Sequence, residues 1–488
     1  MKRITFVLIA SLSLIPTLRA SAASPATNLT FNISGPTMTP LASPWTAYFG
    51  THYASSPGLA GVSWNTVRSY GGTHVGIYDA GSPSAPARKG PFTGNEIRVG
   101  LDNFHAARGG RTAAQLIPDL IQHRATAIYL MSNIVSPGLK PFDKDLAYWA
   151  VRQIHEKYPE ASRWIVWQMG NEVVSGHFDP KEVWQKGAPQ KKAAQKEDNF
   201  FGYDLKWKED FYVNDYLAPA IEAVERASRD LYGDPLQIQI ALGSMNPYNR
   251  QNLEFLKNVM GRTFDGKRAP TLKNEPVWKH IDLLTVHYMT GSPRTIETLQ
   301  QYHDDYLKTG KVKGIWITED HGRAGRGPVT ILDRGLRFLS WVAHNHLTAE
   351  QARLCWWGEG EREPGGMGRE ATELLGRFLR DRPLFFARQQ LAAADVYVLS
   401  DAIGDGVERV LTAIVPHRDG ILPVGGLRLE LPAGGVQKPW TAEVIQYSAA
   451  RPAERLASKP VRESSTLTIR LDRSVQEPLL VTFQPATP

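Results

Sequence analysis

Eight short apolar runs, rich in β-branched and aromatic residues, constrain the fold more than any other feature of this sequence. They occupy residues 46–53, 64–70, 126–133, 164–172, 237–246, 282–288, 314–320 and 353–360. Segments with apolar residues three and four positions apart, the spacing of amphipathic helices, lie at residues 113–124, 145–158, 213–232 and 331–347. Strands that alternate with helices are typical of βα units around a parallel sheet. Eight such strands predict an α/β fold, a (β/α)₈ TIM barrel over residues 46–386.

Helical periodicity ends after Phe386, and short runs of alternating apolar and polar residues follow. These runs occupy residues 396–400, 410–417, 427–432, 440–448, 467–472 and 478–485, with glycine- and proline-rich turns between them. Such spacing predicts a C-terminal antiparallel β-sandwich domain over residues 387–488. A further run at residues 29–34 precedes the barrel, so the N-terminal segment 23–45 can supply an edge strand to this sandwich.

The first 22 residues have the order of a secretory signal peptide. Lys2 and Arg3 precede an apolar stretch at residues 4–18, and small residues for cleavage follow at positions 20–22. A short membrane anchor is the alternative, but this apolar stretch is too short and too interrupted to span a bilayer comfortably. We therefore expect a signal peptide at residues 1–22, a secreted or periplasmic protein, and no membrane span in the mature chain.

The charge and the cysteine content argue against several classes of protein. Removing Lys2, Arg3 and Arg19 with the signal peptide lowers the formal net charge from +7 to +4, which is too small and too scattered to indicate a nucleic-acid partner. Cys355 is the only cysteine, so no intramolecular disulfide can form, and its apolar neighbours predict a buried, inert thiol. The sequence has no zinc-binding Cys/His spacing and no phosphate-binding glycine loop, so we expect no cofactor.

Two of the eight runs end in a carboxylate. The run at residues 164–172 breaks at Gly170 and ends in Asn171 and Glu172, and the run at residues 314–320 carries Glu319 near its end. The C-terminal ends of barrel strands meet at one face, where barrels build their active sites. Two carboxylates at such a face are the minimum equipment for cleaving a glycosidic bond. The alternative is that either glutamate caps a helix or pairs with an arginine.

The placement of these residues on the fourth and seventh runs resembles the large clan of retaining (β/α)₈ glycoside hydrolases, which includes β-xylosidases, α-L-iduronidases and endoglycosidases. The resemblance covers residues 46–386. It implies that Glu172 is the general acid/base and that Glu319 is the nucleophile. It also implies that Asn171 hydrogen-bonds the sugar 2-hydroxyl, and that Arg68, at the end of the second run, hydrogen-bonds the nucleophile and keeps it ionised.

The same resemblance gives four more substrate-binding candidates, on the sixth and eighth runs. His287 and Tyr288 match the His and Tyr that line the clan's sites, although the clan often has one residue between them. Neighbouring strand residues point to opposite faces, so only one of the two reaches the nucleophile unless a bulge intervenes. One of Trp356 and Trp357 resembles the aromatic floor under a sugar ring, and a core position is expected for the other.

The predicted function is hydrolysis of O-glycosidic bonds in an oligo- or polysaccharide by double displacement. Two alternatives stay open: a transglycosylase that uses the same site, and a non-catalytic polysaccharide-binding barrel. Long loops at residues 71–110 and 175–211 are compatible with a pocket for exo action and with a cleft for a polymer. Asp320 and His321 depart from the Phe/Tyr-Gly that usually follows the clan's nucleophile, so the subsites beside Glu319 are not predicted.

Overall fold

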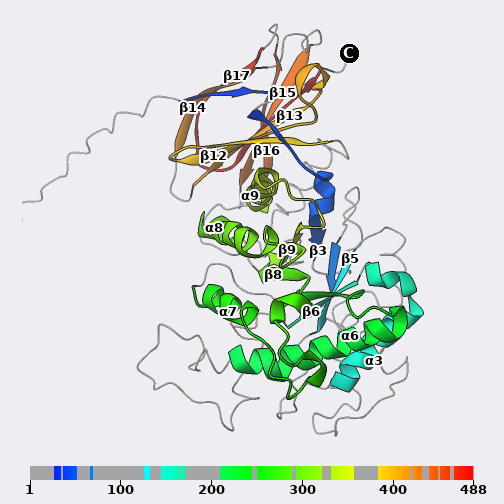
Figure 1. The fold of residues 1–488 in the computed structure, drawn as a ribbon. Coiled ribbons are helices and arrows are strands. Elements are labelled where there is room, and N and C mark those ends of the chain that lie inside the picture. Colours follow the sequence, from blue (N-terminus) through cyan, green and yellow to red (C-terminus); the bar gives the residue numbers. More distant parts are fainter. Residues whose placement is uncertain are drawn as a thin grey trace, which may run out of the picture.

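The computed structural model describes residues 27–33, 37–51, 66–69, 126–131, 144–163, 165–170, 209–243, 250–287, 293–320, 331–356, 383–417, 421–430, 439–448, 451–461 and 466–486. The predicted signal peptide, the predicted helix at 113–124 and the loop at 71–110 lie outside these ranges, as does the loop at 175–211 up to residue 208. Figure 1 shows two parts: strands accompanied by helices, and a group of sheets beyond helix α9 (Ile331–His344).

Eight strands of the first part lie side by side and parallel. They are β3 (Phe49–Thr51), β4 (Thr66–Ser69), β5 (Thr126–Met131), β6 (Ile165–Met169), β7 (Gln239–Leu242), β8 (Leu283–His287), β9 (Gly314–Asp320) and β10 (Ala352–Trp356). Each pairs with the next along the chain, and β10 pairs with β3, so the ring of pairings closes. Seven of the eight predicted runs contain one of these strands, and β10 begins one residue before the eighth run. The first run begins within a 3-10 helix, η2 (Trp45–Tyr48).

Helical segments follow five of these strands, and their bounds are as follows. After β5 come α3 (Lys144–Lys157) and η4 (Pro159–Arg163); after β6, η5 (Tyr212–Leu217) and α6 (Ala218–Tyr232); after β7, α7 (Arg250–Met260), η6 (Pro270–Leu272) and η7 (Val277–His280); after β8, α8 (Pro293–Tyr302) and η8 (His303–Leu307); after β9, α9. Helices α3, α6 and α9 match predicted ones, whereas α7 and α8 are additional.

The segments that follow β3, β4 and β10 lie outside the described residues, so the full (β/α)₈ alternation stays a prediction. Two seams of the ring are narrow: β3 meets β4 through Thr51 and Val67, and β7 meets β8 through Ala241 and Leu283. None of the helices described here is long and apolar enough to cross a membrane.

Successive residues of the barrel strands face opposite ways, and the two faces belong to different cores. One face forms a small cluster inside the ring, made of Val166, Ala241, Leu283, Trp316 and Cys355. The other face belongs to the large core shared with the helices, and includes Trp167, Ile240, Leu284 and Ile317. Cys355 is fully buried, which confirms the predicted buried thiol.

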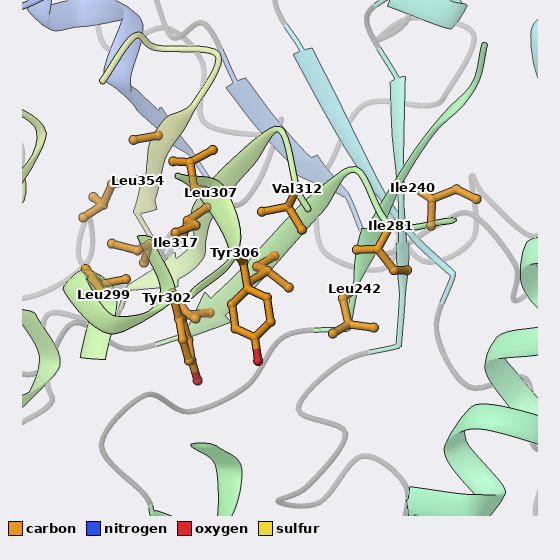
Figure 2. Close-up of a cluster of buried hydrophobic side chains, with 14 of the residues drawn as sticks. Ile240, Leu242, Ile281, Leu299, Tyr302, Tyr306, Leu307, Val312, Ile317 and Leu354 are labelled. Carbon is orange, nitrogen blue, oxygen red and sulfur yellow. The ribbon is translucent and has the colours of Figure 1, made fainter. Parts of the chain in front are cut away.

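Figure 2 shows side chains of α8 and η8 in one buried cluster with side chains of β7, β9 and β10. Side chains from both helical segments are buried in one core with those of the strands, among them Leu299, Tyr302, Tyr306, Leu307, Ile317 and Leu354. The rings of Tyr302 and Tyr306 meet edge to face with centroids 6.3 Å apart. Full burial of a large apolar side chain contributes about 1.5–3 kcal/mol, so this helical layer is a major source of the barrel's stability.

Helix α3 is fixed to the outer face of β6 by a chain of hydrogen bonds that begins in the core. The indole Nε1 of Trp167 donates to Nε2 of His155 at 3.1 Å, and Nδ1 of His155 lies 3.2 Å from the hydroxyl of Tyr232 on α6. Since Nε2 accepts, the neutral ring carries its proton on Nδ1 and donates to Tyr232, which donates to the Pro159 carbonyl at 3.1 Å. His155 is therefore neutral and joins two helices to a barrel strand.

We expect this buried histidine to lower the stability of the fold as the pH falls below about 6.5. Burial lowers the pKa of His155 from 6.5 to about 3. Between these values the unfolded chain binds a proton that the folded chain does not, so the free energy of unfolding falls by about 1.4 kcal/mol per pH unit. Gln at this position can accept from Trp167 and donate to Tyr232 without titrating.

Urea unfolding of the wild type and of His155→Gln at pH 7.5 and pH 5.5 measures this contribution. The loss of unfolding free energy between the two pH values should be smaller in the variant, by about 1.4 kcal/mol. Equal losses in both proteins would show that His155 does not carry the effect.

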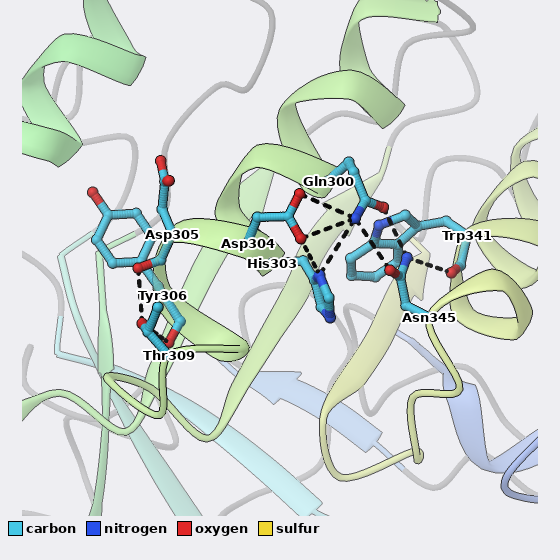
Figure 3. A network of polar contacts seen from close by, with 8 residues as sticks. All are labelled: Gln300, His303, Asp304, Asp305, Tyr306, Thr309, Trp341 and Asn345. Atoms are coloured by element: carbon cyan, nitrogen blue, oxygen red, sulfur yellow. Dashed lines mark hydrogen bonds and ion pairs between the residues drawn. The ribbon is translucent and has the colours of Figure 1, made fainter.

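Polar side chains at their C-terminal ends tie α8 and η8 to α9, as Figure 3 shows. The amides of Gln300 and Asn345 bond to each other in both directions, at 3.1 and 2.8 Å, and Asn345 also donates to the Trp341 carbonyl. His303 donates to Asp304 at 2.9 Å, and this hydrogen bond lowers the pKa of the Asp304 carboxyl. The network fixes the C-terminal end of α9.

The second part contains two sheets. The strands are β1 (Thr27–Asn32), β2 (Thr39–Pro40), β11 (Phe385–Gln390), β12 (Ala394–Ser400), β13 (Val410–Pro416), β14 (Leu422–Glu430), β15 (Trp440–Ser448), β16 (Arg451–Val461), β17 (Thr466–Val475) and β18 (Leu479–Pro485), with a 3-10 turn, η10 (Gly404–Gly406). One sheet has the order β1-β14-β17, the other β16-β15-β18-β13-β12-β11-β2. The pairs are antiparallel except for β1 with β14, which is parallel.

Two central strands of the seven-stranded sheet, β12 and β13, are buried on both faces. Val396 and Val398 of β12 belong to a core shared with the three-stranded sheet. Tyr397 and Leu399, which alternate with them, belong to the large core of the barrel and its helices. The barrel part and the sheets are therefore joined by a continuous apolar core.

A buried ion-pair cluster lies at the same junction. Asp395 of β12, which is 1% exposed, contacts Arg388 of β11 at 2.9 Å and Arg337 of α9 at 3.5 Å. His417, just after β13, lies 3.4 Å from the same carboxylate. Two permanent cations thus compensate the buried charge and connect α9 to the sheet.

Candidate active site

The eight predicted site residues fall into three groups. His287, at the end of β8, is described in full. For Arg68, Glu319 and Trp356 the structure gives the strand pairings of β4, β9 and β10. The others lie outside the described residues: Asn171, Glu172, Tyr288 and Trp357. The register of the strands therefore defines the geometry of this site.

The end of β6, which leads into Asn171 and Glu172, is held by several hydrogen bonds. Gly170 is buried and has a φ of 90°, a left-handed conformation that glycine adopts without strain. Its amide donates to the Gln168 carbonyl at 3.1 Å, and its own carbonyl accepts from the Gln168 side-chain amide at 2.9 Å. The chain therefore turns at Gly170 in one defined way before it reaches the predicted acid/base.

We expect Gly170→Ala to strain this turn and to slow the reaction. A Cβ in the left-handed region costs roughly 1–2 kcal/mol, and a displacement of about 1 Å at a catalytic group costs on the order of a hundredfold in rate. Gly404→Ala is the matched control, because Gly404 also has a positive φ, of 76°, and lies in η10 of the sheet part. Both variants should lose similar stability, measured by thermal unfolding, but kcat should fall in Gly170→Ala alone.

A buried tyrosine joins the ends of β6 and β7. The hydroxyl of Tyr212, in η5, donates to the Met169 carbonyl at 2.8 Å and accepts from the Gly243 amide at 3.2 Å. Burial raises the pKa of Tyr212, so the hydroxyl stays protonated and can make both bonds. The ring stacks on Tyr216 with centroids 5.7 Å apart. Nothing in the local sequence predicts this role, because the partners lie 43 and 31 positions away along the chain.

Strand β9 contains a bulge just before its end, between Ile317 and Asp320. On one side, Val286 pairs with Ile317 but the next residue, His287, pairs with Glu319. On the other side, Leu354 pairs with Ile317 but Trp356 pairs with Asp320. Relative to both neighbouring strands, β9 therefore contains one extra residue. Bulges of this kind re-aim the side chains that follow them and are frequent beside active sites.

His287 lies on the interior face of the barrel. Leu283, four positions earlier, belongs to the cluster inside the ring, whereas Leu284 and Val286 belong to the outer core. Strand alternation therefore places Thr285 and His287 on the same side as Leu283. His287 is fully buried at the C-terminal end of β8, and Glu319 is its register partner. The structure thus brings together two of the predicted site positions.

Asp320, the residue after Glu319, forms a buried ion pair with the helix layer. Its Oδ1 accepts from Nη1 of Arg334, in the first turn of α9, at 2.7 Å, and both side chains are completely buried. Asp320 is thus turned towards the helix outside the ring. The sequence shows that Asp320 departs from the clan's pattern, but it does not reveal the partner, which comes from the next helix.

The polar side chains described near these strand ends include neutral donors and acceptors. Gln168, Thr285 and Thr318 are fully or almost fully buried, as is His287. The hydroxyl of Thr285 donates to the Leu242 carbonyl at 2.5 Å. In the described part of the chain, no group of three or more His, Cys, Asp or Glu side chains is arranged to hold a metal ion.

No protein-family model matches this chain, and no curated protein matches it in sequence. Solved structures share its fold. A glycoside hydrolase family 39 enzyme from Xanthomonas axonopodis pv. citri has a TM-score of 0.53 and 11% sequence identity, over 97% of this chain and 100% of that chain. A family 44 xyloglucanase from Paenibacillus polymyxa, solved with xyloglucan, has a TM-score of 0.51 and 10% identity, over 94% and 99%. The likeness establishes a common fold along nearly the whole chain.

Proposed function

We propose that the protein is a secreted retaining glycoside hydrolase that cleaves O-glycosidic bonds of an oligo- or polysaccharide. The observation that carries the proposal is the bulge in β9, which makes Glu319 the register partner of the interior residue His287. Residues in register on neighbouring strands share a face, so Glu319 faces the barrel interior in this proposal. The fold shared with two glycoside hydrolases supports the same function.

Each carboxylate has one role in this mechanism. Glu319 attacks the anomeric carbon and forms a glycosyl-enzyme, while Glu172 protonates the departing oxygen. Glu172 then takes a proton from water, which releases the sugar with its configuration retained. A retaining enzyme of this kind has its two carboxyl groups about 5–5.5 Å apart. In this proposal Glu172 follows the turn at Gly170, at the end of β6, which is two strands before β8 in the ring.

Strand register also supports our proposal for the residues around the pair. Arg68 pairs with Ile128, which pairs with Val166 of the interior cluster. This register supports our proposal that Arg68 is on the interior face and keeps the nucleophile ionised. Trp356 pairs with Asp320, which is turned to the helix layer, so Trp357 is our choice for the aromatic floor under the sugar. Asn171 remains the proposed partner of the sugar 2-hydroxyl. Because His287 is on the interior face, strand alternation makes His287, and not Tyr288, our choice for the residue beside the nucleophile.

The architecture that we propose around this site is a complete (β/α)₈ barrel over residues 46–386 with a β-sandwich over residues 387–488. The pairing of β1 with β14 is the basis for including the N-terminal segment in the sandwich. Export to the periplasm or beyond follows from the signal peptide proposed at residues 1–22.

Glu172→Ala is expected to separate the two steps of the reaction. An aryl glycoside with a good leaving group needs no proton donor, so its first step should stay within about tenfold of the wild type, whereas alkyl glycosides should lose roughly 10²–10⁴-fold. A screen of aryl glycosides and polysaccharides, in which the release of reducing ends is measured, identifies the substrate. NMR spectroscopy of the first product should show the anomeric configuration of the substrate. Inverted product, or binding of a polysaccharide without cleavage, would contradict the proposal.

A further inference from the structure

We propose that Asp320 and Arg334 are a positioning pair for Glu319, an inference that rests on the proposed function. The pair holds the bulge of β9 from the outside of the barrel, and thereby keeps the preceding residue on the interior face. Neither residue touches the substrate in this account. Both act on the reaction through the backbone of residues 318–320.

The first step of the argument is the change of face at the bulge. Before it, Trp316 belongs to the interior cluster and Ile317 to the outer core. Unbroken alternation would put residue 320 inside with Trp316, and residue 319 outside with Ile317. The contact of Asp320 with α9 shows the reverse for residue 320. The extra residue thus exchanges the faces of positions 319 and 320.

The second step is the strength of the anchor. Nη1 of Arg334 lies 2.7 Å from Oδ1 of Asp320, and both side chains are completely buried. Little solvent therefore screens the attraction between the two charges. Arg334 belongs to α9, whose Phe338 and Trp341 are buried in the large core. Farther along α9, Arg337 pairs with Asp395, and Asn345, just beyond the helix, bonds to Gln300. The carboxylate of Asp320 is therefore held by a helix that is itself fixed at several points.

The third step is why stability alone is a poor reason for this pair. A buried ion pair can be replaced by apolar side chains of similar size with little or no loss of stability, because desolvation of the two charges offsets their attraction. A charge-assisted hydrogen bond fixes the orientation of the Asp320 carboxylate and hence of the peptide bond that precedes Asp320. Apolar side chains do not fix this orientation. A role in orientation therefore predicts loss of rate without loss of folding.

The test compares wild type with Asp320→Leu/Arg334→Met, in which both charges are removed together, and with Arg334→Lys, which keeps the charge but lacks the planar guanidinium. Activity is measured on the aryl glycoside found for the wild type, per folded protein. We expect kcat to fall by about tenfold to a hundredfold in both variants, with KM changed less than twofold. Asp395→Asn is the control, because it disrupts another buried ion pair of α9, away from the site, and should leave kcat unchanged.

Each outcome bears on one hypothesis. Wild-type kcat in a folded double variant, or in Arg334→Lys if the double variant does not fold, would overturn the positioning role. An equal fall of kcat in Asp395→Asn would also overturn it, because the effect would then be a general loosening of α9. If the wild type hydrolyses no glycoside, or Glu319→Gln keeps full activity, the proposed function itself fails and this inference falls with it.

Discussion

Replacing Glu319 by Gln is expected to lower kcat on the order of 10⁴-fold or more with every glycoside, because loss of the group that forms a covalent intermediate has effects of this size. The substitution preserves the volume and removes the charge, so an amide oxygen stands where the attacking carboxylate would be. Position 319 lies at the end of β9 in register with His287. The measurement is the steady-state rate of release of an aryl leaving group, at substrate concentrations above KM.

The control for this substitution is Glu254→Gln. Glu254 lies exposed on α7, on the helix layer of the barrel, and should keep wild-type kcat. Thermal unfolding of both variants establishes that each is folded. Residual activity of Glu319→Gln above one hundredth of the wild type, in a preparation free of wild-type protein, would remove Glu319 from the role of nucleophile.

Tyr397→Ala is expected to lower the free energy of unfolding by about 3–5 kcal/mol, the range for removing a buried aromatic ring. Tyr397 is fully buried in β12, on the face of the sheet that joins the barrel's core. Its ring meets Phe386 edge to face at 5.9 Å, and the guanidinium of Arg388 also lies 5.9 Å from the ring centre. Because that core is continuous, the loss should destabilise the barrel and the sheets together.

Differential scanning calorimetry measures this effect as a lower Tm within a single transition. Leu236→Ala is the control, because Leu236 is 54% exposed and its loss should change stability by less than about 0.5 kcal/mol. Two separate transitions, of which only the one belonging to the sheets moves in Tyr397→Ala, would contradict a shared core.

The strands of the barrel could be predicted closely where the sequence is apolar on both faces. Residues 314–320 are predicted and observed over the same range, since a strand buried between the interior and the helices leaves a continuous apolar run. The run at 46–53 is less informative, because its first three residues, up to the buried Tyr48, belong to the 3-10 helix η2 and not to a strand. Apolarity there indicates burial but does not select the backbone conformation.

The alternation of the C-terminal runs predicted strands but not their full burial. Val396, Val398, Tyr397 and Leu399 are all apolar, and the pattern does not show that they serve two different cores. Strands β11 and β16 were not predicted. Four charged residues lie within β16, at positions 451, 454, 455 and 459, together with prolines at 452 and 460. Proline is depleted in strands, so the composition of this segment hides the strand.

The candidate site could be predicted as a set of residues but not as a geometry. The carboxylate of Glu319 at a strand end is visible in the sequence, yet the bulge that pairs it with His287 depends on the register of β8 and β10 on either side. Tyr212 lies 43 positions from the Met169 carbonyl that it bonds, and Arg334 lies 14 positions from Asp320. Neither position has a local signature in the sequence. Long-range contacts of this kind become visible only when the strands are placed side by side.

Mass spectrometry of a trapped intermediate tests the central claim most directly. The Glu172→Ala variant is incubated with an activated aryl glycoside, and its proteolytic peptides are then mapped. In this variant the glycosyl-enzyme still forms, but its hydrolysis is slow because no general base activates the water. We predict that one glycosyl group is found on the peptide that contains residues 314–320, attached to Glu319. A glycosyl group on another residue, or turnover in the wild type with inverted configuration and no covalent intermediate, would contradict the account.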